Sequence, residues 1–189
     1  IRLVFQVVGS TTAKMALLEK GDKISDILGP LGTPSKIKKY GTVLMLGGGV
    51  GIAALFPVLK ALKEAGNRVI TIIGGRSSDL VIMKDDCAKY SDKLIITTDD
   101  GTEGVKGVVT DPIKALIKEG EKFNQSWCIG PSIMMKHCSL VAKSLELPIY
   151  VSLNSLMVDG TGMCGCCRVT VDKKILFTCV DGPEFDGQK

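Results

Sequence analysis

The sequence predicts an α/β fold built on a doubly wound, parallel sheet of five strands. From Thr42 onward, short runs rich in β-branched residues alternate with segments of helical spacing. A glycine-rich turn follows the first of these runs, and a cysteine-rich loop with a hairpin closes the chain. Alternation of strands and helices favours a parallel sheet, because each helix returns the chain to the edge where the next strand begins.

The individual elements follow from this alternation. The expected strands are Thr42–Leu46, Val69–Ile73, Leu94–Thr97, Ser126–Ile129 and Ile149–Leu153. The expected helices are Ile52–Glu64, Asp79–Tyr90, Pro112–Lys122 and Ser132–Leu145. The third helix has a clear start signal, since Asp111 precedes a proline at the first helical position.

The segment before Thr42 does not show this alternation of strands and helices. Arg2–Val8 and Ile24–Leu28 predict strands, and Ala13–Glu19 predicts a short helix. A cluster of turn residues, Gly29 to Pro34, marks a boundary. So short a segment cannot bury a core of its own, so residues 1–34 are expected to be the end of an antiparallel barrel. Ile1 already lies in an apolar run, and we expect the natural N-terminus upstream.

Composition excludes several classes of protein. The chain has 189 residues, 45% hydrophobic and 23% charged, with a net charge of +4, which is ordinary for a globular protein and too weakly basic to indicate nucleic acid. Gly41 to Leu59 carries no charge, but its glycines and Pro57 favour strand, turn and helix over a membrane span. Seven cysteines, an odd number, argue against a disulfide framework. We expect a cytoplasmic protein.

The most specific motif lies near the C-terminus, in residues 156–189. Asp159, Cys164, Cys167 and Cys179 have the spacing D-x4-C-x2-C-x11-C, which is the plant-type iron–sulfur spacing with aspartate as the first ligand. Cys166 adjoins Cys167 and is expected to point away from the metal. The fourth ligand would return on a hairpin of Arg168–Val171 and Ile175–Val180.

Other interpretations of this loop remain open. Structural zinc needs four N or S ligands, often as two C-x2-C pairs, and a second pair is missing. A thioredoxin-like motif should open a helix after a strand, whereas this one precedes a hairpin. Asp159 could also serve only to cap the loop by accepting backbone N–H groups.

A second motif follows the first strand of residues 35–155. Gly49, Gly51 and Ala54 fit G-x-G-x-x-A at a strand-to-helix turn. Such a turn lets a pyrophosphate approach the backbone and the helix N-terminus, so we expect Gly48, Gly49, Val50 and Gly51 to bind a dinucleotide. Alternatively, the glycines only allow the helix to pack closely on the strand.

Two further segments are expected at the same edge of the sheet. No acid ends the second strand; Arg76 stands there and could meet a ribose or a 2′-phosphate, which leaves NAD and NADP both open. After the fourth strand, Gly130, Pro131 and Met134 would line the crevice, and Cys128 could touch a nicotinamide or be a small buried residue. His137 is the only histidine, so no Ser/His/Asp arrangement can form and no catalytic side chain is expected.

Together these motifs resemble the ferredoxin–NADP reductase superfamily. The resemblance rests on Gly-Gly-Gly-Val-Gly-Ile-Ala at 47–53, Gly-Pro-x-x-Met-Met at 130–135, and the C-terminal loop. Residues 152–165 are similar to the small subunits of NADH-dependent reduced ferredoxin:NADP oxidoreductases, also described as sulfide dehydrogenase subunits. The similar electron-transfer subunit of dihydroorotate dehydrogenase has cysteine in place of Asp159.

The resemblance implies a reductase-type NAD(P) domain, an FAD-binding barrel and a [2Fe–2S] cluster. It places Gly9, Thr11 and Thr12 near the flavin diphosphate. The family's flavin-binding Arg-x-Tyr/Phe-Ser segment would precede Ile1, so this chain alone is expected to hold FAD poorly. Electrons would pass from NAD(P)H through FAD and the cluster to a large flavin/iron–sulfur subunit, and to ferredoxin or another carrier. The alternatives are an electron-transfer subunit of dihydroorotate dehydrogenase or hydrogenase, or a zinc-stabilised nucleotide-binding module.

Overall fold

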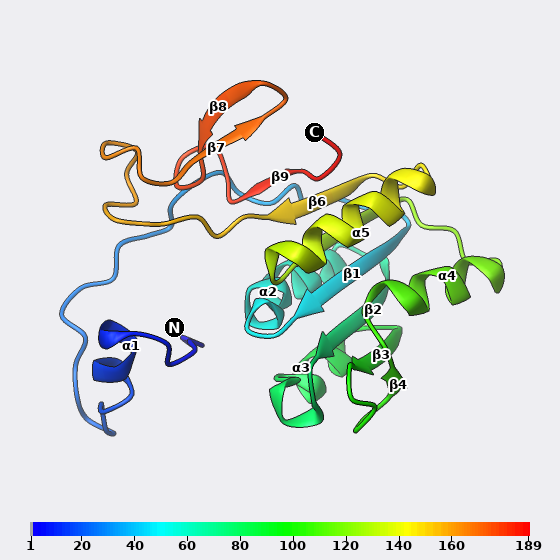
Figure 1. The fold of residues 1–189 in the computed structure, drawn as a ribbon, viewed down its shortest axis with the longest axis horizontal. Coiled ribbons are helices and arrows are strands. Elements are labelled where there is room, and N and C mark those ends of the chain that lie inside the picture. Colours follow the sequence, from blue (N-terminus) through cyan, green and yellow to red (C-terminus); the bar gives the residue numbers. More distant parts are fainter. Residues whose placement is uncertain (1) are drawn as a thin grey trace.

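The computed structural model describes residues 2–189, so the apolar run that begins at Ile1 is described from Arg2 onward. The structure consists of an α/β domain, a small N-terminal segment at one side of it, and a hairpin near the C-terminus (Figure 1). Within residues 2–189, none of the helices has the length and apolar character that a bilayer crossing needs.

The sheet has seven strands in the order β4-β3-β2-β1-β5-β6-β9. Their bounds are β1 (Thr42–Gly48), β2 (Arg68–Gly75), β3 (Lys93–Thr98), β4 (Val105–Lys106), β5 (Gln125–Ile129), β6 (Ile149–Ser152) and β9 (Glu184–Asp186). All five predicted strands are confirmed, and they are parallel. The edge strands β4 and β9 were not predicted, because each is too short to show an alternating pattern in the sequence. β9 runs antiparallel to β6.

Helices cover both faces of this sheet (Figure 1). α2 (Gly51–Glu64) and α3 (Lys84–Tyr90) pack on one face, where Leu55, Leu59 and Ile73 are fully buried. α4 (Thr110–Lys118) and α5 (Ser132–Ser144) pack on the other. The doubly wound architecture is therefore confirmed, and the order of its five long strands reverses between β1 and β5.

Three predicted helices differ from the structure. The helix expected at Ala13–Glu19 is α1 (Ser10–Met15), which starts and ends earlier in the chain. The single helix expected at Asp79–Tyr90 is divided into a 3₁₀ turn, η1 (Ser78–Leu80), and α3. Val81 turns inward between them and is 3% exposed, which breaks the helical path. α4 ends at Lys118 instead of Lys122, because Gly120 takes a left-handed conformation with φ of 89°.

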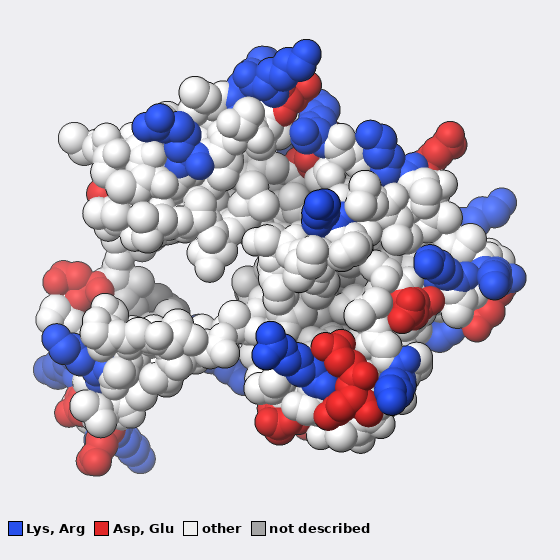
Figure 2. Space-filling view, viewed as in Figure 1, with Lys and Arg blue, Asp and Glu red and all other residues white. Residues whose placement is uncertain are grey.

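The N-terminal segment contains the helix α1 (Ser10–Met15) and, from Arg2 to Gly41, no strand. The strands predicted at Arg2–Val8 and Ile24–Leu28 are therefore wrong, because neither run meets a partner strand among the described residues. Arg2 Nη1 lies 2.8 Å from the Asp86 carboxylate of α3. Figure 2 shows an opening between the rest of this segment and the α/β domain.

The C-terminal hairpin is confirmed, with a shorter second strand. β7 (Arg168–Val171) pairs with β8 (Lys174–Phe177) through a two-residue turn. Asp172 and Lys173 both have positive φ, 50° and 63°, as a type I′ turn requires. Because β8 ends at Phe177, Cys179 lies in the turn after the strand rather than on it.

The Glu184 carboxylate connects the segment before β1, the central sheet and the segment after the hairpin. Glu184 of β9 accepts the Ser35 hydroxyl at 2.6 Å and the indole N–H of Trp127 at 3.1 Å. Trp127 is fully buried on β5. Glu184 therefore anchors both the linker before β1 and the segment after the hairpin to the sheet.

Candidate cofactor sites

The glycine turn lies where ligands bind in doubly wound sheets. β1 and β5 are parallel neighbours at the switch point of the sheet, so their carboxyl ends lie side by side. Gly49 has φ of 53°, and a Cβ atom added there would meet nothing within 4 Å. Val50 is 45% exposed at the start of α2. Gly49 and Val50 thus present an open backbone surface at the helix N-terminus.

The other glycines of this turn are explained by packing. A Cβ atom at Gly51 would lie 2.6 Å from the carbonyl oxygen of Ile129, and one at Gly48 would overlap the sulfur of Met134. Gly130 belongs to the same contact, since its added Cβ would lie 3.0 Å from the Cε of Met134 and 3.2 Å from the Cα of Gly48. The structure thus brings the predicted residues of both loops together, with Pro131 also exposed beside them.

Arg76 and Cys128 have different surroundings. Arg76 is exposed just after β2, at the carboxyl edge of the sheet. Cys128 is fully buried in the core beneath α5. Contact with the Cys138 thiol, together with burial, raises the pKa of Cys128 well above its ordinary value. The structure therefore places Cys128 in the core and away from the crevice, where a small apolar role suits it.

In the cysteine loop, two thiols are brought together from distant positions. Cys167 and Cys179 are 2% and 7% exposed, and their sulfur atoms lie 3.2 Å apart. The N–H of Cys179 lies 3.5 Å from the Cys167 sulfur, and this hydrogen bond lowers the pKa of Cys167. A stabilised thiolate is the form that binds metal.

Asp159 and Cys164 form a second pair across the loop. The Asp159 carboxylate accepts the N–H of Thr161 at 2.8 Å and the N–H of Cys164 at 2.7 Å. These bonds, led by that of Thr161, lower the pKa of Asp159. Cys164 and Cys166 are both exposed, and the N–H of Cys166 lies 3.5 Å from the Cys164 sulfur. Asp159 thus caps the loop and remains ionised, as a metal ligand must be.

This donor set fits an iron–sulfur cluster better than a single ion. Within residues 2–189, no group of three His, Cys, Asp or Glu side chains converges on one point. The donors instead form two pairs: the sulfur atoms of Cys167 and Cys179 lie together, and the Asp159 carboxylate contacts both the backbone N–H and the thiol of Cys164. A [2Fe–2S] cluster takes two protein ligands on each of its two irons, whereas tetrahedral zinc needs four donors around one centre.

The predicted flavin residues lie at the start of α1. Thr12 is committed to capping, since its hydroxyl oxygen accepts the N–H groups of Val8 and Gly9 at 3.0 and 3.1 Å. Gly9 precedes the helix in an extended conformation, and Thr11 is exposed.

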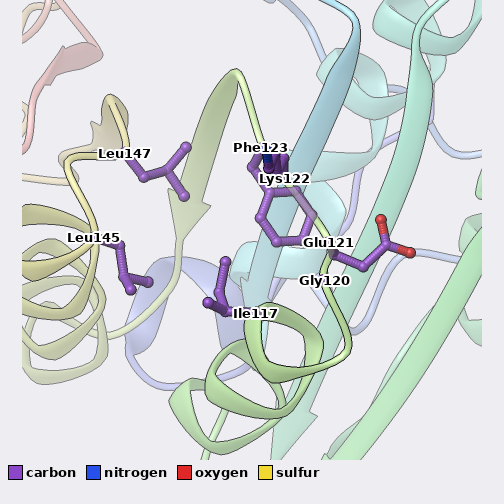
Figure 3. A pocket seen from close by; sticks show the side chains of 7 residues that line it. All are labelled: Ile117, Gly120, Glu121, Lys122, Phe123, Leu145 and Leu147. Atoms are coloured by element: carbon purple, nitrogen blue, oxygen red, sulfur yellow. The ribbon is translucent and has the colours of Figure 1, made fainter.

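A mainly apolar hollow of about 380 Å³ lies at the opposite edge of the sheet (Figure 3). Phe123, Ile117 and Leu147 line it, and it lies where the chain enters β5 and β6. Its one acid, Glu121, forms a bidentate pair with Arg68. None of the residues predicted for the nucleotide, flavin or cluster sites lines it.

Sequence reasoning missed Asp99, which follows β3 at the crevice edge. Its N–H donates to the carbonyl oxygen of Gly75 at 3.1 Å, which sets it beside the end of β2. The sequence does show an acidic residue directly after a predicted strand. That this residue lies beside the end of β2 follows only from the pairing of β2 with β3 in the folded sheet.

Comparison with known proteins agrees with this geometry. Residues 154–189 match the family model of the iron–sulfur cluster binding domain of dihydroorotate dehydrogenase B. A dihydroorotate dehydrogenase B (NAD(+)) electron transfer subunit homolog of Thermotoga maritima is 56% identical over 188 residues, covering 100% of this chain and 66% of that protein. A probable electron transfer subunit of the same enzyme in Methanocaldococcus jannaschii is 39% identical, covering 96% and 68%.

A solved structure of an NADH-dependent reduced ferredoxin-NADP oxidoreductase, described for flavin-based electron bifurcation, also matches. It is 55% identical with a TM-score of 0.90, and the match covers 97% of this chain and 66% of that one. The chain thus spans about two thirds of the length of these relatives.

Proposed function

Because the chain belongs to the family of dihydroorotate dehydrogenase B electron transfer subunits and their homologues, we propose that it transfers electrons between a nicotinamide nucleotide and a partner subunit. When bound, the nicotinamide and a flavin exchange hydride, and a [2Fe–2S] cluster exchanges single electrons. The protein contributes the position, the polarity and the shielding of each group. The ferredoxin:NADP oxidoreductase type is favoured over dihydroorotate dehydrogenase, because Asp159 stands where the latter has cysteine.

The nicotinamide nucleotide is assigned to the crevice between β1 and β5. Its diphosphate would lie on Gly49 and Val50, where backbone N–H groups and the positive end of the α2 dipole favour an anion. Gly48 and Gly51 act indirectly, because their close packing against the β5 loop holds the turn in place. Gly130, Pro131 and Met134 would form the opposite wall, and Arg76 the edge next to β2.

The cluster is assigned to Asp159, Cys164, Cys167 and Cys179. Cys167, whose pKa is lowered by the backbone N–H of Cys179, and the ionised carboxylate of Asp159 are favoured as negative donors. A carboxylate is a harder ligand than thiolate with the same charge. Cys166 remains outside the set. The hydrogen bond from the Cys179 N–H to the Cys167 sulfur adds a polar contact of the kind that tunes cluster potentials.

FAD is assigned to the N-terminal side, with Gly9, Thr11 and Thr12 near its diphosphate. Support comes from the ordered start of α1 and from the opening between this segment and the α/β domain (Figure 2).

A large flavin/iron–sulfur subunit is the proposed partner, with ferredoxin or a similar carrier as the further acceptor. The exposed apolar side chains beside the cysteine loop support a protein partner, since such side chains gather at stable interfaces. Leu156, Val158 and Met163 are 70%, 69% and 89% exposed.

The occurrence of four paired donors and a nucleotide-type glycine turn in one chain carries this proposal. The test adds NADH anaerobically to the protein with its cofactors and partner subunit, and follows bleaching of the visible absorption. We expect NADH to bleach the wild type, whereas Gly49→Asn, whose side chain would fill the diphosphate position, should respond only to a chemical reductant. Gly66→Asn is the matched control, because Gly66 also has positive φ, 81°, and open space at the far end of α2. NADH bleaching of Gly49→Asn at the wild-type rate would contradict the assignment.

A further inference from the structure

The cysteine loop and its hairpin carry one thiol more than the proposed cluster uses. The proposed ligands are Asp159, Cys164, Cys167 and Cys179. They leave Cys166 without a role, although its thiol is exposed to solvent. An exposed thiol is open to oxidation, so the presence of Cys166 beside a ligand is not explained by the cluster alone.

The side chain of Cys166 lies against Cys164. The N–H of Cys166 lies 3.5 Å from the Cys164 sulfur, and the two thiols are in hydrogen-bonding contact. Gly165 between them has φ of 69°, a left-handed conformation that bends the chain. On an extended chain, residues two apart lie about 7 Å from each other, which exceeds the Cα separation of most disulfides. The bend at Gly165 therefore brings the two thiols within reach of one another.

The four thiols thus form two pairs that differ in their access to solvent. Cys167 and Cys179 are 2% and 7% exposed, and their sulfur atoms lie 3.2 Å apart. Cys164 and Cys166 are both exposed. In a chain that has not yet received its cluster, Cys164 is therefore the ligand thiol that a dissolved oxidant reaches first.

We propose that hydrogen peroxide converts Cys164 and Cys166 into a reversible disulfide in chains that have not yet received a cluster, and that Cys166 thereby preserves Cys164 as a ligand. The proposal rests on the proposed assignment of Cys164 to the cluster. It gives the spare thiol a function before the cluster is inserted, and none in the loaded protein.

The oxidation takes two steps that conserve atoms and electrons. The Cys164 thiolate attacks the O–O bond of the peroxide, takes one oxygen to become a sulfenic acid, and releases hydroxide. The Cys166 thiol then attacks that sulfur: the S–S bond forms, the S–O bond breaks, and the oxygen leaves as water with the thiol proton. The two sulfur atoms together lose two electrons, which reduce the peroxide. A dithiol reductant restores both thiols by exchange.

Without Cys166, the first step leads to damage. A sulfenic acid with no neighbouring thiol takes up further oxygen from peroxide and becomes a sulfinic or sulfonic acid, which dithiols do not reduce. Cys167 does not replace Cys166, because its sulfur lies against that of Cys179 and is buried. Loss of Cys166 should therefore matter only when the cluster-free chain meets peroxide.

The first measurement locates the disulfide. The full-length protein is stripped of iron by a chelator under reducing conditions, freed of reductant, treated with hydrogen peroxide and digested with trypsin. Cys164, Cys166 and Cys167 share the peptide of residues 144–168, whereas Cys179 lies on another. We expect mass spectrometry to find Cys164 joined to Cys166, whether or not Cys167 is joined to Cys179.

The second measurement is the iron content after treatment with a dithiol and reconstitution. Peroxide-treated wild type should regain most of its iron, whereas Cys166→Ser should regain at least about threefold less, with added oxygen on Cys164. Cys166→Ala is a second variant and should behave likewise. Met163→Leu is the matched control, because it removes another exposed and oxidisable side chain beside Cys164 and should recover as the wild type does. Without peroxide, all of these proteins should take up equal iron.

The possible failures are distinguishable. Sulfinic acid at Cys164 of the wild type, or Cys166 joined to Cys167 or Cys179, would overturn the proposal. Full recovery of iron by peroxide-treated Cys166→Ser would overturn it as well. A wild type that takes up no iron before any peroxide is added would overturn the cluster assignment and, with it, the role of Cys166, whether or not the disulfide forms.

Discussion

The sulfur atoms of Cys167 and Cys179 lie 3.2 Å apart, although β7, a tight turn and β8 separate the two residues along the chain. The hairpin therefore brings the residues that follow β8 back to the residue that precedes β7. The N–H of Thr178 donates to the Cys167 carbonyl at 3.1 Å and holds these two ends of the hairpin together. In the proposed assignment, these two thiols would supply one half of the cluster's ligands.

The first prediction concerns the choice of cysteines. Cys167→Ser and Cys179→Ser should each lose most of the iron, because each removes one member of the buried pair. Cys164→Ser should also be damaging. Cys166→Ser is the matched control, since this exposed neighbour should leave the iron and sulfide content unchanged. Loss of iron in Cys166→Ser equal to that in Cys167→Ser would show that the ligand set is wrong.

The second prediction separates ligation by Asp159 from capping. Asp159→Ala should give a labile or absent cluster, whereas Asp159→Cys should retain a cluster with an altered EPR spectrum, because a soft sulfur replaces a hard oxygen on iron. Thr161→Pro is the control for capping, since it removes one of the two N–H groups that the carboxylate accepts. An unaltered spectrum and full iron content in Asp159→Ala would mean that Asp159 only caps the loop.

The third prediction concerns the anchor at Glu184. Glu184→Ala leaves the buried Trp127 N–H without its acceptor and should lower the free energy of unfolding by about 2 kcal/mol. Glu184→Gln keeps one acceptor oxygen and should cost about half as much. Urea unfolding followed by the fluorescence of Trp127, the only tryptophan, measures both. Equal stability of Glu184→Ala and wild type would remove the anchoring role.

The fourth prediction is a dependence of stability on pH. Asp92 accepts Lys63 Nζ at 2.7 and 2.8 Å and the Val69 N–H at 2.7 Å, and the hydrogen bond from Lys63 is the main reason that its pKa is lowered. A lowered pKa stabilises the fold above the unfolded pKa, and this contribution is lost as the pH falls through the folded one.

Asp92→Asn should therefore lower the free energy of unfolding by about 1 kcal/mol at pH 7, a modest value because the pair is partly exposed to solvent. The difference from wild type should shrink below about pH 4. Urea titrations at several pH values measure it. A difference that stays constant into the acid range would contradict the role of the ionised carboxylate.

The sequence predicted best the parts of the fold that depend on local pattern. β1, the turn at Gly49 and α2 carry a strand period, a glycine signal and a helix period in succession, and all three are confirmed. The strand expected at Arg2–Val8 failed because β structure depends on a partner strand. β9 was missed because three residues, Glu184 to Asp186, carry no period.

In the candidate sites too, the sequence shows what depends on local spacing but not what depends on contacts between distant segments. The spacing around Cys164 and Cys167 reveals a ligand motif, but the approach of Cys179 to Cys167 depends on where β8 ends. Asp99 was not singled out because its nearness to Gly75 arises from the pairing of β2 with β3. Cys128 lies after buried positions in its strand, and only the packing of α5 shows that it belongs to the core.

The most direct test of the central claim is the visible and EPR spectrum of anaerobically purified protein, with iron and acid-labile sulfide measured on the same sample. We predict a coloured protein with about two irons and two sulfides per chain, and an EPR signal that appears on reduction. A colourless protein with stoichiometric zinc, which has no visible absorption because its d shell is full, would contradict the account.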